Sequence, residues 1–290
     1  MGRSRIKLPR GWAQRARDDA EDGRSPSVPR DAATVVLVRQ APGDLGFEVF
    51  LLRRTRALEF APGVCVFPGG SVDEHDADPG IDWAGPSPAD FGDHLGTSPE
   101  RARALVCAAA RETFEESGVL LAGPREPSPV TLLQDSAAQA RDRHALLDGS
   151  ISLSELLVSR GLVLRADLLT PWARWITPTV SPRRFDTWFF VAVLPPGQTA
   201  SVAAESERGS VSAESDSGTW LRPSAALDAA RAGEITLLPP TAVTLSELAA
   251  YQDVAGILAE HRTITPLMPE VILEDGQAWL AMPQAVEYPL

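Results

Sequence analysis

Three glutamates, Glu112, Glu115 and Glu116, stand within five consecutive residues, a spacing that could bring their carboxylates together on one turn of a helix. At 100° per residue the three side chains fall within an arc of about 100°, and the apolar Cys107 and Phe114 fall on the opposite side. Carboxylates at this spacing repel one another and weaken the helix that carries them. The pattern therefore favours a counter-cation, with a solvated acidic face as the alternative.

A divalent cation at these carboxylates would permit phosphate chemistry. Hard carboxylate oxygens suit Mg²⁺ or Mn²⁺, which retain coordination positions for water and substrate phosphates. Such an ion neutralises charge on phosphate oxygens and lowers the pKa of a bound water towards neutrality. Arg111, four residues before Glu115, would form an ion pair with it and orient a carboxylate. Upstream, Gly69 and Gly70 could approach the metal or the phosphates closely because they carry no side chain.

The glutamates require a helix that begins near residue 98. Ser98 is a suitable N-cap, Pro99 suits the first helical position, and Glu100 suits the positive end of the helix dipole. Gly118 is a suitable residue to end the helix. The sequence therefore predicts a helix between Ser98 and Gly118, with one face packed on a sheet and three carboxylates on the other.

Runs of β-branched and aromatic residues indicate the strands of that sheet. They fall at residues 34–38, 47–52, 64–67, 175–178 and 185–194 and around Trp220. Residues 68–98 are rich in Asp, Gly, Pro and Ser and predict a loop of unusual length. Strands interleaved with helices indicate an α/β or α+β sandwich.

Further helices are expected in the second half of the chain. Within residues 129–169, Ser152 and Glu155 form a capping box before a stop at Gly161, which predicts a helical insertion. Two more helices are expected at 224–231 and 241–260. Asp275-Gly276 predicts the turn of a final hairpin.

Charge is distributed unevenly along the chain. The net charge is −12, yet the first 30 residues carry eight Arg or Lys against four Asp or Glu. We expect residues 1–30 to form a disordered basic tail, and the acidic remainder to repel nucleic acid. No apolar run approaches the roughly 18 residues of a membrane span. We therefore expect a cytoplasmic protein with no membrane partner, in which Cys65 and Cys107 are reduced core thiols.

The glutamate region resembles the Nudix family. The Nudix box consists of Gly, five residues, Glu, seven residues, and then Arg-Glu-apolar-x-Glu-Glu-x-Gly-apolar. Gly70 corresponds to the first glycine, and residues 111–119 correspond to the second half, with Thr113 in the apolar place and Phe114 one position late. The second half of the box is therefore nearly intact.

The first half of the box departs from this pattern. Gly70 to Arg111 spans 41 positions where the usual box spans 14, so an insertion of 27 residues interrupts it. Counted from Gly70, the middle glutamate of the box falls at Asp76. Counted back from Arg111, it falls at Arg103.

An interrupted box is a feature of the Nudix subgroup that includes the peroxisomal coenzyme A diphosphatase of animals. The chain resembles this subgroup over roughly residues 32–255, notably at 111–121, 175–178, 183–187, 220–223 and 237–240. The resemblance implies a Nudix-type α/β/α sandwich with a mixed sheet, a fold compatible with a homodimer. The implied Nudix domain covers residues 31–222, with insertions at about 76–98 and 125–170. Residues 223–290 would form a helical extension packed on it.

The resemblance also implies roles for individual residues. Glu112, Glu115 and Glu116 would carry metals, and Glu112 or a downstream carboxylate would activate water. Glu214 lies six residues before Trp220, where some Nudix enzymes place an additional metal-binding glutamate. The other carboxylates of the same acidic segment are alternatives: Glu205, Glu207 and Asp216.

Two adjacent arginines, Arg183 and Arg184, precede the predicted strand at 185–194. Paired guanidinium groups suit the recognition of substrate phosphates. Ordinary surface ion pairing is the alternative for either residue.

The implied reaction is metal-dependent hydrolysis of the pyrophosphate bond in a nucleoside diphosphate linked to another moiety. Coenzyme A or an acyl-coenzyme A is the first substrate to expect. The alternatives are a Nudix hydrolase of ADP-ribose, dinucleotides or nucleotide sugars, and an inactive Nudix domain that binds a nucleotide and regulates a partner. Nucleotide binding without metal-dependent turnover would favour the regulator.

Overall fold

Eight strands within the described part of the chain form one mixed central sheet, in the order β11-β3-β2-β10-β9-β12, with β4 beside β3 and β5 beside β2. The computed structural model describes residues 4–8, 14, 25–44, 46–55, 63–126, 136–203, 215–284 and 286–290. The strands of this sheet are β2 (Arg30–Gln40), β3 (Phe47–Arg54), β4 (Cys65–Val66), β5 (Gly69–Ser71), β9 (Thr170–Ile176), β10 (Phe185–Val193), β11 (Ser215–Leu221) and β12 (Pro266–Leu267). Because β2 pairs in parallel with β10 and antiparallel with β3, the predicted mixed α+β class is confirmed.

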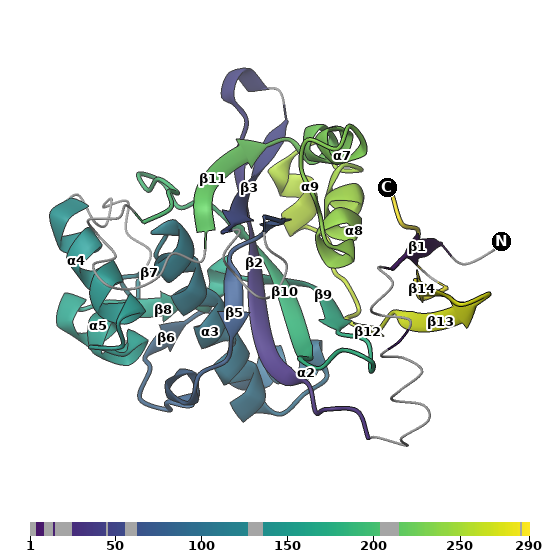
Figure 1. Ribbon diagram of the computed structural model, residues 1–290. Helices are drawn as coiled ribbons and strands as arrows, with labels where there is room; N and C mark the ends of the chain where they lie inside the picture. Colours follow the sequence, from purple (N-terminus) through teal and green to yellow (C-terminus); the bar gives the residue numbers. More distant parts are fainter. Residues whose placement is uncertain are drawn as a thin grey trace.

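Alternate residues of β2 face two apolar layers. Ala33, Val35 and Leu37 belong to the core cluster that includes α3, whereas Val36 and Val38 belong to the cluster that includes the three C-terminal helices. These four helices are α3 (Pro99–Ser117), α7 (Pro223–Arg231), α8 (Pro239–Leu248) and α9 (Val254–Leu258). Helices therefore cover both faces of the sheet, in the α/β/α arrangement that the resemblance implied (Figure 1).

Helix α3 begins and ends where the sequence predicted. The Ser98 side chain accepts a hydrogen bond from the Arg101 backbone N–H, and Pro99 occupies the first turn. Gly118 ends the helix in the left-handed conformation, with φ of 71°. Cys107 and Phe114 are buried against the sheet, as the predicted orientation of the helix requires.

Phe114→Ala should lower the free energy of unfolding by about 3–5 kcal/mol, because the lost ring leaves a cavity in the core. The Phe114 side chain is 1% exposed and belongs to the cluster between α3 and the sheet. Denaturant unfolding measures the change. Val158→Ala, at a position that is 72% exposed, serves as the control and should shift stability by less than about 0.5 kcal/mol. An unchanged denaturant midpoint of unfolding for Phe114→Ala would mean that α3 does not turn Phe114 towards the core.

Residues 68–98 are not the single long loop that the composition predicted. They contain β5, η2 (Glu74–Ala77), β6 (Trp83–Ala84) and α2 (Pro88–Leu95). Helix α2 begins with a capping box between Ser87 and Asp90 and buries Phe91 and Leu95. The prediction failed because the abundance of Gly, Pro and Asp concealed the helix-start signal of Ser87-Pro88.

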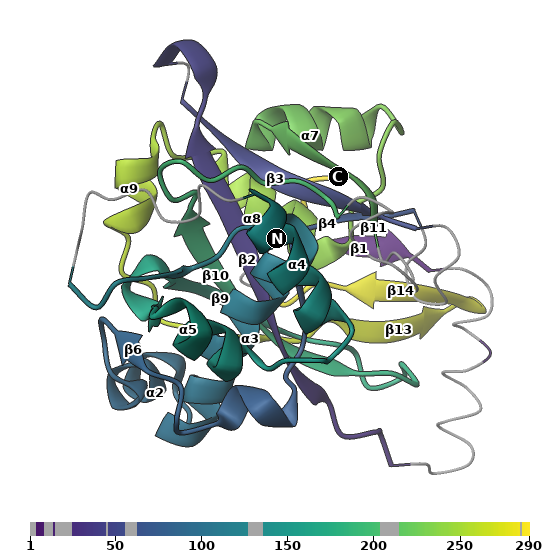
Figure 2. The same cartoon turned by 90° about the vertical axis from the view of Figure 1, so that its left-hand side faces the viewer.

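The helices predicted within residues 129–169 are present as α4 (Ser136–Leu147) and α5 (Leu153–Arg160). The capping box of Ser152 and Glu155 and the stop at Gly161 are confirmed. Residues after α5 form β8 (Val163–Arg165) and the 3₁₀ turn η3 (Ala166–Leu168), and β8 pairs with β6 and with β7 (Ala122–Gly123). The two segments that were expected to be insertions therefore share a small sheet. Figure 2 views the molecule from the side of α4 and α5.

The C-terminal region contains strands as well as helices. The helix predicted at 241–260 is interrupted between α8 and α9, because Asp253 accepts a hydrogen bond from the Gly256 N–H and starts a new helix. The predicted hairpin is confirmed as β13 (Glu270–Glu274) and β14 (Gln277–Ala281). Asp275 and Gly276 both have positive φ, as a tight hairpin turn requires. The extension expected at 223–290 is therefore not wholly helical.

Part of the expected disordered tail is ordered. Strand β1 (Arg5–Lys7) pairs with β14, and Arg5 forms an ion pair of 2.7 Å with Glu274. The sequence did not predict this strand because its partner lies more than 260 residues away. Most of residues 9–24 lie outside the described part of the chain. Among the helices that are described, none is both long and apolar enough to cross a membrane.

Candidate active site

The three glutamates lie together on the last two turns of α3, facing the backbone of β5. The side chains of Glu112 and Glu115 are 14% and 12% exposed. The Gly69 N–H donates a hydrogen bond of 2.8 Å to Glu116 Oε2. The predicted acidic face therefore exists and is held against the sheet instead of projecting freely into solvent.

Gly70 lies directly against Glu112. A Cβ atom added at Gly70 would stand 2.4 Å from Glu112 Oε1, which is far too close for any side chain. The sequence placed this glycine near the metal or the phosphates. A side chain at this position would instead displace the carboxylate of the metal-binding candidate Glu112.

Gly70→Ala should therefore reduce turnover more than it reduces stability. The added methyl group would displace the Glu112 carboxylate, and a small misplacement of a catalytic group can reduce the rate by about 100-fold. Steady-state kinetics, with the melting temperature recorded in parallel, would measure both effects. Gly256→Ala on α9 is a matched control, because Gly256, like Gly70, has no positive φ, and a Cβ added there would meet its neighbours only at 3.5 Å. Equal losses of activity in the two variants would contradict the proposed packing.

Arg111 connects the glutamates to the loop that follows β5. Its guanidinium donates to Glu112 Oε1 at 2.9 Å and to both oxygens of Glu115 at 3.2 Å. It also donates to both oxygens of Asp76 at 2.9 Å and to the Ser71 carbonyl at 2.9 Å. Burial lowers the pKa of Arg111, but the hydrogen bond to Asp76 and the neighbouring carboxylates outweigh it and raise that pKa. Arg111 is therefore a permanent cation that orients the acidic face.

Asp76 is one of the two positions that the sequence left open for the middle residue of the box. Its side chain is 1% exposed and pairs with Arg111 through two hydrogen bonds. It also accepts the Asp73 N–H, which closes the capping box of η2. Arg103, the other candidate position, donates to the Ile81 carbonyl and lies over the Trp83 ring. Of the two candidate positions, only Asp76, counted from Gly70, is shown in contact with Arg111.

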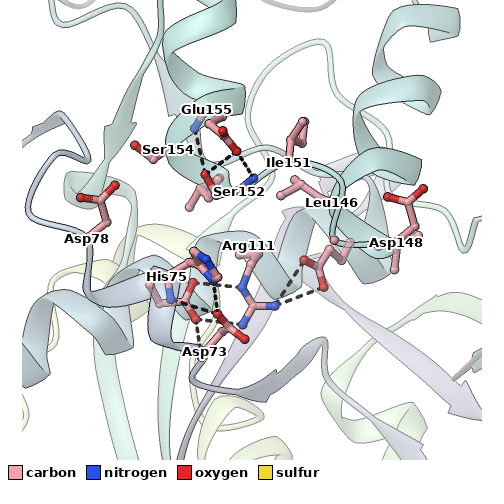
Figure 3. Close-up of a pocket in the computed structure, with 15 residues that line it drawn as sticks. Asp73, His75, Asp78, Arg111, Leu146, Asp148, Ile151, Ser152, Ser154 and Glu155 are labelled. Atoms are coloured by element: carbon pink, nitrogen blue, oxygen red, sulfur yellow. Dashed lines mark hydrogen bonds and ion pairs between the residues drawn. The ribbon is translucent and has the colours of Figure 1, made fainter.

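A pocket of about 700 Å³ opens beside Arg111 and Glu115. One wall is η2 with its flanking residues, and the other is the end of α4 and the start of α5 (Figure 3). Its lining consists of Asp73, His75, Asp76, Asp78, Arg111, Glu115, Leu146, Leu147, Asp148, Gly149, Ile151, Ser152, Leu153, Ser154 and Glu155. The helical insertion therefore forms part of the candidate active site.

The same insertion holds the end of the glutamate helix. The buried Arg143 of α4 donates from Nε to the Glu115 carbonyl at 2.8 Å, and Gln139 donates to the Gly118 carbonyl. These carbonyls lie at the C-terminal end of α3, where a cation also interacts favourably with the helix dipole. The wall of the pocket and the glutamates are therefore fixed relative to each other.

The carboxylates suit a divalent cation by their chemistry. They supply hard oxygen atoms from one helix face, and Gly70 leaves room for the Glu112 carboxylate. Across the described residues, no three metal-binding side chains converge on one point. Glu112 and Glu115 instead turn towards Arg111, and Glu116 turns towards the Gly69 N–H.

Other predicted site residues lie elsewhere. Glu214 lies outside the described residues, as do Glu205 and Glu207, and Asp216 is exposed on β11. The Arg184 side chain is buried and donates to the Thr177 and Ser27 carbonyls.

Arg184 thus connects the start of β10 to neighbouring loops, because its guanidinium N–H groups donate to acceptors within the protein. This placement argues against the predicted phosphate-binding role for Arg184. Arg183 is exposed.

Comparisons with known proteins agree with this geometry. The family model of the NUDT19 Nudix domain matches residues 90–248. The human acyl-coenzyme A diphosphatase NUDT19 is 29% identical, over 80% of this chain and 72% of its own length. The putative nudix hydrolase 7 of Caenorhabditis elegans is 27% identical, over 88% of this chain and 72% of its own. The crystal structure of a NUDIX hydrolase from Alicyclobacillus acidocaldarius is 30% identical with a TM-score of 0.66, covering 82% and 98% of the two chains.

A mixed sheet between helical layers, with a glutamate helix packed on a Gly-Gly strand, defines a hydrolase of the Nudix class. The chain belongs to the Nudix hydrolase family, within the NUDT19 Nudix domain group, and is a pyrophosphohydrolase. The matched region begins at residue 90. The assignment of Gly70 and Asp76 to the first half of the box therefore depends on the contacts described above.

Proposed function

We propose that this protein is a divalent-metal-dependent hydrolase of coenzyme A or acyl-coenzyme A. The products would be an adenosine bisphosphate and a phosphopantetheine or its acyl derivative. The main support is the network in which Arg111 joins Asp76 to Glu112 and Glu115 at the edge of a pocket. Relatives named acyl-coenzyme A diphosphatase, from human and chicken, support the choice of substrate.

In this proposal, Glu112, Glu115 and Glu116 would hold Mg²⁺ or Mn²⁺, and the bound ion would neutralise charge on the pyrophosphate and lower the pKa of a water. Arg111 keeps two of these carboxylates in place, and the Gly69 N–H keeps the third. Glu112 or a downstream carboxylate accepts the proton of the water. The water oxygen bonds to one phosphorus while the bridging P–O bond breaks, and the leaving group departs as a phosphate monoester.

Two further residues complete the proposal. Glu214 is our candidate for an additional metal ligand, by its position before Trp220. We also retain the exposed Arg183 as a candidate contact for a substrate phosphate, whereas Arg184 is occupied within the protein.

Product analysis over a substrate panel tests the proposal. The purified protein would be incubated with coenzyme A, acetyl-coenzyme A, ADP-ribose, NADH and nucleotide sugars, each with Mg²⁺, with Mn²⁺ and with chelator. We expect metal-dependent release of phosphopantetheine products from the first two. If only another member of the panel were cleaved, pyrophosphate hydrolysis would remain supported, but coenzyme A would be rejected as the substrate. Nucleotide binding without any cleavage would contradict the proposal.

A further inference from the structure

We propose that the pocket between η2 and the α4–α5 turn binds the uncharged arm of the substrate, on the side of the pyrophosphate away from the adenosine. This inference builds on the proposed function. It assigns the helical insertion a direct role in recognising the amide-containing chain of coenzyme A. The adenosine end, with its additional phosphate, would then lie outside this pocket.

The charges that line the pocket support an uncharged occupant. Besides Asp76 and Glu115, which pair with Arg111, the lining contains four more carboxylates: Asp73, Asp78, Asp148 and Glu155. The basic side chains in the lining already have carboxylate partners: His75 pairs with Asp73 at 2.8 Å, and Arg111 pairs with Glu115. A phosphate deep in this pocket would meet like charge, whereas amide N–H and hydroxyl groups could donate to the carboxylates.

Apolar groups and size agree with the same occupant. Leu146, Ile151 and Leu153 line the wall from the insertion, so methylene and methyl groups of an arm would contact apolar surface. The volume of about 700 Å³ lies within the range of roughly 300–1,000 Å³ that is usual for small-molecule sites. An extended chain of amides, a hydroxyl and methylenes fits both the chemistry and the space.

Local hydrogen bonds give each wall of the pocket a defined conformation, which favours a preformed site. On one side, Asp73 accepts the His75 N–H at 2.9 Å within the capping box of η2. On the other, Glu155 accepts the Ser152 N–H at 2.8 Å at the start of α5 (Figure 3). A preformed site reduces the entropy lost when a flexible arm is bound. Because Arg111 and Glu115 line the same pocket, an arm bound there leads directly to the glutamates.

Filling the pocket tests this inference. Ile151→Trp should raise KM for coenzyme A by roughly tenfold or more, because the arm loses its space. The same variant should leave kcat/KM nearly unchanged for an analogue in which a methyl group replaces the whole arm. Val158→Trp, on the exposed side of α5 and outside the pocket lining, is the matched control and should behave like wild type.

Equal losses on coenzyme A and on the methyl analogue would overturn the inference, and so would unchanged kinetics on both. If the wild-type protein does not cleave coenzyme A with metal present, the proposed function fails and the inference with it. A wild-type protein that cleaves coenzyme A but tolerates Ile151→Trp would reject the arm pocket alone.

A charge change distinguishes the two ends of the substrate without depending on a bulky replacement. Ser154 lines the pocket, and Ser154→Lys would add a cation there, with Ser154→Gln as an uncharged control of similar length. Because the arm is uncharged, we expect KM for coenzyme A to change by less than about twofold between these variants. A much lower KM in the lysine variant, lost with dephospho-coenzyme A, would place the adenosine phosphate in the pocket and overturn the inference.

Discussion

Glu116→Gln should lower kcat by about 100-fold or more. Rate losses of this size are usual when a group that stabilises charge in the transition state is removed. The replacement keeps the shape of the side chain, and its amide oxygen can still accept the Gly69 N–H that Glu116 Oε2 accepts at 2.8 Å. It removes the negative charge that would bind the cation. We therefore expect a folded protein with an unchanged melting temperature and little activity.

Glu100→Gln provides the matched control for this variant. Glu100 lies in the first turn of the same helix, exposed and at the opposite end from the site. Steady-state kinetics on both variants, with the metal concentration varied, would separate a general charge effect from a local one. A wild-type rate in Glu116→Gln would remove the glutamate face from the mechanism.

Arg111→Met should destabilise the protein by about 3–5 kcal/mol, the usual cost of leaving one member of a buried ion pair alone. Asp76 is 1% exposed and would lose both of its hydrogen bonds to the guanidinium. Activity should fall as well, because Glu112 and Glu115 lose the donor that orients them.

A double variant separates these two effects. Arg111→Met combined with Asp76→Leu replaces the ion pair by apolar groups, so much of the stability should return while activity stays low. Denaturant unfolding and turnover would be measured on the two single variants and on the double variant. Additive losses of stability in the double variant would show that Asp76 and Arg111 are not coupled.

The glutamate helix could be predicted from local signals alone. Ser98, Pro99 and Gly118 mark its ends through short-range capping interactions, and the helical period separates Phe114 from Glu115. The central strands were predicted for the same reason, since their buried residues form continuous apolar runs. Local sequence is sufficient where the deciding interactions lie within a few residues.

Features that depend on distant contacts were missed. Asp76 has its role because it meets Arg111, 35 residues further along the chain, and the sequence alone could not choose between Asp76 and Arg103. Strand β1 exists through pairing with β14 at the other end of the chain. Helix α2 was missed for another reason. Its capping box at Ser87 and Asp90 is a local signal, but the high Gly, Pro and Asp content of the segment concealed it.

The role of the insertion also depends on distant contacts. Capping signals at Ser152 and Gly161 predicted α5 but not what it faces. Its position beside the active site follows from α4, where Arg143 reaches the Glu115 carbonyl 28 residues earlier in the chain. In our proposal the insertion therefore belongs to the candidate active site, because it supports α3 and forms a wall of the pocket.

Hydrolysis of coenzyme A in ¹⁸O-labelled water is the most direct test of the central claim, that the glutamate face directs metal-dependent attack of water on a pyrophosphate. The products would be identified by mass spectrometry with Mg²⁺, with Mn²⁺ and with chelator. The account predicts adenosine bisphosphate and phosphopantetheine, with one labelled oxygen on a phosphoryl group and no reaction in chelator. Cleavage that persists in chelator, products without the label, or an intact substrate in the presence of metal would contradict it.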